Sequence, residues 1–205
     1  LINELNEAPE VHGILVQLPL PKQIDEKAII GAIDPLKDVD GFSPQNIYRL
    51  FYGGEKLSSA TPHGIVTMLD YIGMGDLSGK HVVIINRSTI VGKPLIFLLL
   101  NRNATVTICH SRTADLPSFT KQADVLVTAI GRRKSEDDSF FITPDMVKEG
   151  VVVIDVSTPH GDVDFENVKE KALCITPVPG GVGPMTITML LQNVLDAYSA
   201  QVSKG

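Results

Sequence analysis

The sequence predicts an α/β fold in which helices cover both faces of a doubly wound, parallel sheet. Short apolar runs alternate with helix-like segments along the whole chain, and each run is continuously apolar. Continuous runs are typical of strands that are buried on both faces, and the alternation of strand and helix is typical of a parallel sheet. The predicted strands are residues 11–18, 82–85, 104–109, 125–129, 151–156 and 172–175.

Segments of helix-like composition lie between these strands. The clearest helix start is Thr61-Pro62, because threonine is a good N-cap and proline is favoured at the first helical position. Residues 180–184 are interpreted as a flexible crossing, and residues 132–139 as a solvated surface loop. The predicted helices are residues 26–32, 44–50, 61–72, 91–101, 118–122, 165–171 and 184–201.

The composition excludes several classes of protein. The chain has 205 residues, of which 43% are hydrophobic, and its net charge of -6 argues against a nucleic-acid backbone binder. The longest apolar run, residues 95–100, is far shorter than the roughly 20 residues of a membrane helix. Cys109 and Cys174 lie in apolar runs and are predicted to be buried, reduced thiols, which favours a cytoplasmic protein. No His/Cys spacing indicates a metal site.

A strand, a tight turn and a helix start follow one another between Gly79 and Pro94. Such a turn directs backbone N–H groups at an anion, which here could be a dinucleotide pyrophosphate. Of the usual G-x-G-x-x-G glycines only Gly92 is present, so the spacing alone also fits an ordinary strand–turn–helix unit. The interpretation as a Rossmann-like NAD(P)-binding domain therefore needs further support.

The end of the next strand favours NADP over NAD. A NAD site would place an acidic residue there for the ribose hydroxyls, but the segment from Cys109 has no acid until Asp115. Arg87, Ser111 and Arg112 could instead hold a 2′-phosphate, although each could also be an ordinary loop residue. Residues 128–131 and 155–157 end strands at the ligand-binding edge of the sheet. They could line the cofactor, or they could be ordinary strand ends.

Six blocks, taken together, resemble one family. They are Gln17-Leu-Pro-Leu-Pro21, Lys37-Asp-Val-Asp-Gly41, Thr61-Pro62-x-Gly64, Arg87-Ser-x-x-Val-Gly-x-Pro94, Ala104-Thr-Val-x-x-Cys-His-Ser111 and Pro177-Val-Pro-Gly-Gly-Val-Gly-Pro-Met-Thr186. The chain is identified by them as a member of the bifunctional methylenetetrahydrofolate dehydrogenase/methenyltetrahydrofolate cyclohydrolase family. The blocks follow the family order across nearly the whole sequence.

The resemblance implies an enzyme of one-carbon metabolism that supplies purine biosynthesis. NADP+ would take a hydride from 5,10-methylenetetrahydrofolate, and the resulting 5,10-methenyl compound would be hydrolysed to 10-formyltetrahydrofolate. Residues 1–60 would be the remnant of a folate-binding α/β catalytic domain, completed by helix 184–201. Residues 61–76 would form a linking helix, and residues 77–176 the NAD(P)-binding domain. The family also implies a homodimer that works in the cytoplasm on tetrahydrofolate derivatives, without nucleic acid or membrane.

The resemblance also implies roles for individual residues. Asp40 would accept the paired hydrogens of the pterin, and Gln17 would polarise the folate, so both would be catalytic. The folate-binding residues would be Gln17, Leu18, Pro19, Asp40, Pro179, Gly180 and Gly181. The cofactor-binding residues would be Thr61, Asn86, Arg87, Ser88, Val91, His110, Ser111, Arg112, Ala129, Gly131, Val182 and Thr186.

The sequence departs from the family pattern at several positions. The family carries a catalytic Tyr-x-x-x-Lys upstream of the Gln17 block, whereas residues 1–16 contain neither Tyr nor Lys, so that segment is expected to be missing. Asn86 and Ser157 stand where glycine is usual. Two alternatives therefore stay open: a truncated form that binds NADP and folate without turnover, and another two-domain dehydrogenase with a similar nucleotide unit.

Overall fold

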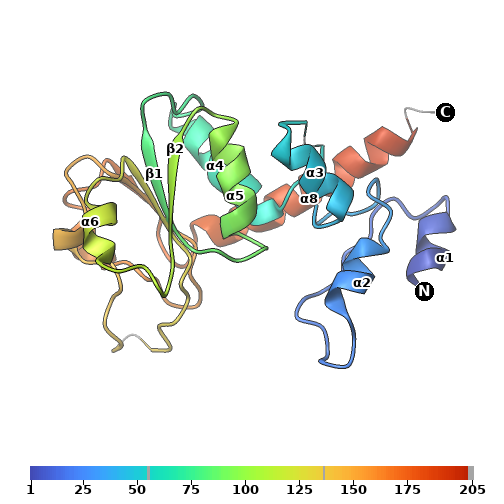
Figure 1. Ribbon diagram of the computed structural model, residues 1–205, viewed down its shortest axis with the longest axis horizontal. Helices are drawn as coiled ribbons and strands as arrows, with labels where there is room; N and C mark the ends of the chain where they lie inside the picture. Colours follow the sequence, from blue (N-terminus) through green and yellow to red (C-terminus); the bar gives the residue numbers. More distant parts are fainter. Residues whose placement is uncertain (55, 136, 203–205) are drawn as a thin grey trace. The chain divides into compact units, whose positions relative to one another are not determined.

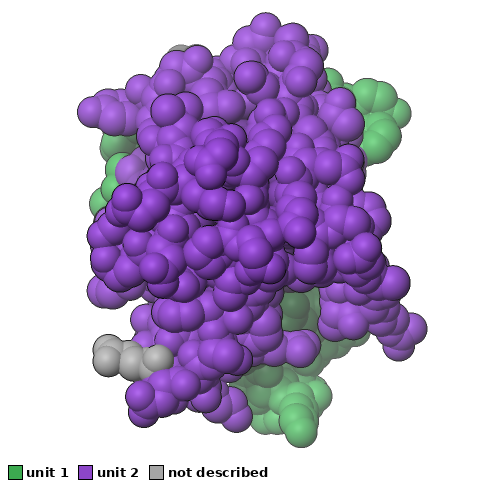
Figure 2. Space-filling view, turned by 90° about the vertical axis from the view of Figure 1, so that its left-hand side faces the viewer, with its two compact units in different colours: residues 1–60, 187–205 green, residues 61–186 purple. Residues whose placement is uncertain are grey.

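The chain folds into two compact units. The computed structural model describes residues 1–54, 56–135 and 137–202. Unit 1 comprises residues 1–60 and 187–205, and unit 2 comprises residues 61–186, as coloured in Figure 2. Each unit is described below by itself.

Unit 2 is built on a five-stranded parallel sheet. The strands are β1 (His81–Ile85), β2 (Thr105–Cys109), β3 (Val125–Thr128), β4 (Val152–Asp155) and β5 (Cys174–Ile175), in the order β2-β1-β3-β4-β5. Every pairing is parallel, and the residues of β3 and β4 are all buried. The predicted α/β class with a Rossmann-like parallel sheet is therefore confirmed.

Helices cover both faces of this sheet, as predicted for a doubly wound fold. Figure 1 shows α4 (Ala60–Tyr71) and α5 (Gly92–Leu100) on one side and α6 (Leu116–Thr120) on the other. A short 3₁₀ helix, η1 (Pro144–Met146), and α7 (Phe165–Val168) complete the layer around β4 and β5. Helix α6 begins two residues before its predicted start, and α7 is shorter than predicted.

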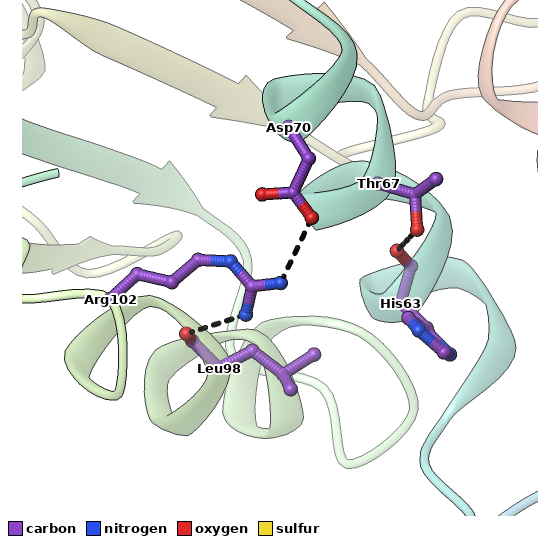
Figure 3. A network of polar contacts seen from close by, with 5 residues as sticks. All are labelled: His63, Thr67, Asp70, Leu98 and Arg102. Carbon is purple, nitrogen blue, oxygen red and sulfur yellow. Dashed lines mark hydrogen bonds and ion pairs between the residues drawn. The ribbon is translucent and has the colours of Figure 1, made fainter. Parts of the chain in front are cut away.

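Arg102, just beyond the end of α5, joins α5 to α4. Its guanidinium donates to the carboxylate of Asp70 at 3.2 Å and to the carbonyl of Leu98 at 3.4 Å, and Thr67 donates to the carbonyl of His63 within α4 (Figure 3). The Arg102–Asp70 pair is partly exposed, so its contribution to stability is small.

Helix α8 (Val182–Val202) is longer than predicted. Residues 180–184 were expected to form a flexible crossing, but the helix already begins at Val182. Pro184 lies in the first turn, where the missing N–H of proline removes no intrahelical hydrogen bond. The crossing is therefore helical from Val182 onward.

Unit 1 is mainly helical in its described residues. It contains α1 (Ile2–Glu7), α2 (Glu26–Gly31), α3 (Pro44–Phe51) and the later part of α8. Asp25 and Ser43 cap α2 and α3 by accepting hydrogen bonds from backbone N–H groups of the first turn. The buried Lys37 ammonium donates to three backbone carbonyls at the end of α1, at 2.6–3.0 Å. Helix α1 was not predicted.

Two predictions from the sequence are wrong, and a third, the solvated loop at residues 132–139, fails at Arg133. Residues 11–18 form no strand, because only a single parallel bridge, from Ile14 to Asp38, gives this segment a neighbouring backbone. Loop 132–139 is not uniformly solvated, since Arg133 is buried; its guanidinium donates to the carbonyls of Asp138 and Gly161 and lies 3.9 Å from the Phe140 ring. Cys174 is exposed, because it lies on the two-residue edge strand β5.

Candidate functional site

A cavity of about 340 Å³ opens at the carboxyl ends of β1, β2 and β3. The chain passes from β1 to β2 on one side and then crosses from β2 to β3 on the other side of β1, and this reversal makes the carboxyl end of β1 a topological switch point. Open α/β sheets bind ligands at such a point. The cavity is lined by Ile85, Asn86, Arg87, Ser88, His110, Ser111, Leu116, Ala129, Ile130, Arg132 and Phe141.

Asn86 organises the turn that follows β1. Its side-chain oxygen accepts the N–H groups of Ser88 at 2.7 Å and Gly92 at 3.1 Å, while its amide donates to the carbonyl of Ala129 at 2.7 Å. A Cβ on Gly92 would lie 2.3 Å from the Asn86 carbonyl oxygen, so only glycine fits there. The asparagine in place of a family glycine therefore ties the β1 turn to the end of β3.

The polar side of this cavity suits an anion. Arg87, Arg132 and His110 line it, together with the hydroxyls of Ser88 and Ser111. The Nδ1 atom of His110 accepts the Arg112 N–H at 3.1 Å. Within the described part of the chain, no carboxylate lines this cavity.

A second cavity in unit 2, of about 440 Å³, lies beside the end of β4. Thr61 and Thr186 line it, and their hydroxyls are 2.9 Å apart. Gly181 must be glycine, because a Cβ there would lie 2.5 Å from the Pro177 carbonyl oxygen. The whole segment from Pro177 to Pro184 lines this cavity.

The β4 end of this cavity holds a buried acidic group, Asp155. Asp155 accepts the N–H groups of Ser157 and Val163, each at 3.0 Å, and also the Ser157 hydroxyl. Burial raises the pKa of the Asp155 carboxyl above its ordinary value, and these hydrogen bonds oppose the rise.

In unit 1, Asp38 and Asp40 differ in their surroundings. Asp38 is buried and accepts hydrogen bonds from Gly41 N, Ser43 N and Asn46 Nδ2 at 2.7–3.0 Å. Asp40 is half-buried, and no described residue donates a hydrogen bond to it. Burial, and then the nearby charge of Asp38, raises the pKa of Asp40 to about 6.

The other predicted folate residues of unit 1 lie on an exposed segment. Gln17 is exposed, and its amide donates to the carbonyl of Leu18 at 3.1 Å. The Ile14–Asp38 bridge sets this segment alongside the one that carries Asp40. Gln17 lies three residues after Ile14, and Asp40 lies two residues after Asp38. The two residues therefore lie on neighbouring backbone segments.

The structure groups most of the predicted site residues, but not all. The first cavity gathers Asn86, Arg87, Ser88, His110, Ser111 and Ala129; the second gathers Thr61, Pro179, Gly180, Gly181, Val182 and Thr186. Val91, Arg112 and Gly131 line neither cavity. Gln17, Leu18, Pro19 and Asp40 belong to unit 1.

Several lining residues were missed by the sequence reasoning. Arg132 and Phe141 belong to the first cavity, and Thr158 belongs to the second. Asp162 holds the end of β3 without lining either. Its position in a Gly-Asp turn gave no signal, because its partners are about 30 residues earlier in the chain.

Residues 1–54, 56–135 and 137–202 contain neither a candidate metal site nor a candidate membrane span. No group of three or more His, Cys, Asp or Glu side chains could hold a metal ion. No helix in this part has both the length and the apolar content to cross a membrane.

Family models match both parts of the chain. The NAD(P)-binding domain of tetrahydrofolate dehydrogenase/cyclohydrolase matches residues 59–202, and the catalytic domain of the same family matches residues 1–40. A curated relative, the bifunctional protein FolD of Acidovorax sp. (strain JS42), is 56% identical over 203 residues, which cover 96% of this chain and 70% of the relative.

Solved structures agree. The methylenetetrahydrofolate dehydrogenase/cyclohydrolase of Campylobacter jejuni superposes with a TM-score of 0.89 at 48% identity, covering 97% of this chain and 71% of that one. The Trypanosoma brucei enzyme, solved with NADP and an inhibitor, gives a TM-score of 0.88 at 35% identity, covering 98% of this chain and 71% of that one.

Proposed function

Because the chain belongs to the tetrahydrofolate dehydrogenase/cyclohydrolase family, we propose that it oxidises 5,10-methylenetetrahydrofolate with NADP+ and hydrolyses the 5,10-methenyl product to 10-formyltetrahydrofolate. The observation that carries the proposal is the first cavity. It lies at the switch point of the sheet and brings cationic and hydroxyl side chains together from the ends of two neighbouring strands.

The lining of the first cavity supports NADP as the cofactor. Arg87 follows β1, and His110 and Ser111 follow β2, so a ribose phosphate between the two strand ends would meet all three side chains. The turn held by Asn86 leads into the N-terminus of α5, whose positive dipole end would favour a pyrophosphate. When bound, NADP+ supplies the hydride acceptor.

Asp40 is proposed to orient the folate. The pterin carries an amino group beside a ring N–H, and an ionised carboxylate can accept both hydrogens. With a pKa of about 6, Asp40 is mostly ionised at pH 7.5, and two N–H donors would stabilise that form further. Gln17 would offer its amide to the folate from the neighbouring backbone.

The second cavity is proposed to hold the reacting half of the cofactor. Its backbone segment from Gly180 to Val182 carries no bulky side chain at the glycines, so two ligands could approach each other closely there. Thr61 and Thr186 would supply hydroxyl groups to the same end.

A substitution at Arg87 tests the cofactor assignment. Arg87→Ala should weaken NADP+ binding by more than about tenfold and leave NAD+ binding nearly unchanged, because only NADP carries the 2′-phosphate. Lys93→Ala, which removes the same charge from an exposed position outside the cavity, is the control. Equal losses for NADP+ and NAD+ would contradict the assignment. Isothermal titration calorimetry gives both affinities.

Turnover is tested separately from binding. Formation of the methenyl product from methylenetetrahydrofolate and NADP+, followed by its hydrolysis, would support both steps. Tight binding of NADP+ and tetrahydrofolate without product would instead support the alternative, a binding form of the same family without catalysis.

The wider assignments rest on the family resemblance alone. We propose a homodimer in the cytoplasm that feeds one-carbon units to purine biosynthesis. Sedimentation velocity tests the dimer, and cell fractionation tests the compartment.

A further inference from the structure

A buried carboxylate fixes the carboxyl end of β3. Asp162 is fully buried, and it accepts hydrogen bonds from the Thr128 hydroxyl at 2.9 Å, from Ile130 N at 2.7 Å and from Gly131 N at 3.0 Å. A carboxylate that accepts three hydrogen bonds in a buried setting is a strong organiser of the surrounding backbone.

The same residue also reaches the end of β4. The backbone N–H of Asp162 donates to the Ser157 hydroxyl oxygen at 2.8 Å, and that hydroxyl donates to the Asp155 carboxylate. Thr128 and Asp155 are the last residues of their strands and lie in register. A continuous polar network therefore joins the ends of two adjacent strands.

This network lies between the two cavities. Ile130, whose N–H Asp162 accepts on one side, lines the first cavity. Asp155 and Ser157, which it reaches from the other side, line the second. A ligand whose two halves occupied the two cavities would contact both ends of this hydrogen-bond network.

Asp162 also occupies a site that could attract an anion. Successive backbone N–H groups next to a residue with positive φ form a nest that binds phosphate or carboxylate. Ile130 and Gly131, whose φ is 61°, present such a pair, and Asp162 accepts both N–H groups. Both N–H groups of this pair are thus taken by Asp162 and are not available to a phosphate.

We propose that Asp162 is a positioning residue for the dinucleotide. Its carboxylate accepts the N–H groups of Ile130 and Gly131 after β3. It thereby ties the loop that lines the first cavity to the loop that lines the second. Both halves of the cofactor thereby meet a fixed surface. The inference rests on the proposed function, since it presupposes that NADP binds in these cavities.

Asp162→Asn is the first test. Asparagine keeps the size of the side chain, but its NH2 group would face a backbone N–H and lose one of the accepted hydrogen bonds. The affinity for NADP+ should fall about tenfold. Asp164→Asn is the matched control, because Asp164 lies two residues away and accepts hydrogen bonds from Asn167 instead. The control should bind NADP+ like the wild type.

A pair of substitutions at Thr128 keeps the test valid if Asp162→Asn fails to fold. Thr128→Val removes one donor to Asp162 without changing shape, and should weaken NADP+ binding about threefold. Thr128→Ser restores the hydroxyl and should restore the affinity. Thermal midpoints are measured for every variant alongside NADP+ affinity.

The outcomes separate the two proposals. If the wild type binds NADP+ and the folded variants bind it equally well, with only their thermal midpoints lowered, Asp162 is merely structural and the inference is overturned. If the wild type does not bind NADP+, the proposed function fails, and the inference fails with it. Weaker binding that Thr128→Ser restores supports the positioning role.

Discussion

The buried aspartates of unit 2 and Asp38 of unit 1 contrast with Asp40 of unit 1, and the contrast separates carboxylates that build the fold from one that is available to a ligand. In unit 2, Asp162 and Asp155 are both buried and both accept several hydrogen bonds. In unit 1, Asp38 is buried and accepts three. Asp40, two residues later, is half-buried and accepts none from the described residues.

The difference follows from what each carboxylate meets. Backbone N–H groups that converge on Asp38 and Asp162 offset the cost of burial, so these residues shape the loops around them. Asp40 carries a similar cost without that compensation, and its pKa is raised to about 6 as a result. A half-buried carboxylate without hydrogen-bond donors is a strong acceptor for a ligand that carries a pair of N–H groups.

The largest expected effect is on the carboxylate that builds unit 1. Asp38→Ala should lower the free energy of unfolding by about 3 kcal/mol, because three buried donors lose their acceptor. Hydrogen exchange should accelerate at the Gly41 and Ser43 amides. Asp196→Ala, at a partly exposed aspartate of the same unit, should change the free energy by less than about 0.5 kcal/mol. Equal effects of the two substitutions would mean that the hydrogen bonds accepted by Asp38 do not stabilise unit 1.

The next effect concerns ligand binding. Asp40→Asn should weaken tetrahydrofolate binding by about 10- to 100-fold, since a charge-assisted pair of hydrogen bonds is replaced by a mismatched amide. Asp196→Asn serves as the control in the same titration. Unchanged affinity in Asp40→Asn would mean that Asp40 does not contact the folate.

The smallest effect is on the pH dependence of stability. The pKa of Asp40 is higher in the folded chain, at about 6, than the ordinary 3.8, so the folded state binds more protons between these pH values. The contribution of Asp40 to the free energy of unfolding therefore falls as pH rises from about 4 to about 6. Asp40→Asn lacks this loss. It should be more stable than the wild type by about 1 kcal/mol at pH 7.5, after allowance for solvent screening, and equally stable near pH 4. Chemical denaturation at the two pH values gives the comparison.

The sheet of unit 2 could be predicted because its signal is local. Continuous apolar runs such as residues 82–85 and 125–128 are buried on both faces, and the sequence pattern records that directly. Residues 11–18 have the same composition but form no strand, because a strand depends on neighbouring backbone that composition does not reveal.

The polar organisation of the site could be predicted only in part. Arg87 and Ser111 were found because they follow strands at the ligand-binding edge. Asp162 and Arg133 were missed, since their partners lie five to 34 residues away and the surrounding sequence reads as a polar loop. Asn86 was identified as a departure from the family, but its bond to Ala129 becomes visible only when β1 and β3 are adjacent.

The most direct test of the contrast is the titration of the Asp40 side-chain carboxyl carbon by NMR, with and without saturating tetrahydrofolate. The account predicts a pKa of about 6 in the free protein and a lower pKa with folate bound, because the pterin N–H donors favour the ionised form. A free-protein pKa near the ordinary 3.8, or a raised pKa that folate leaves unchanged, would contradict it.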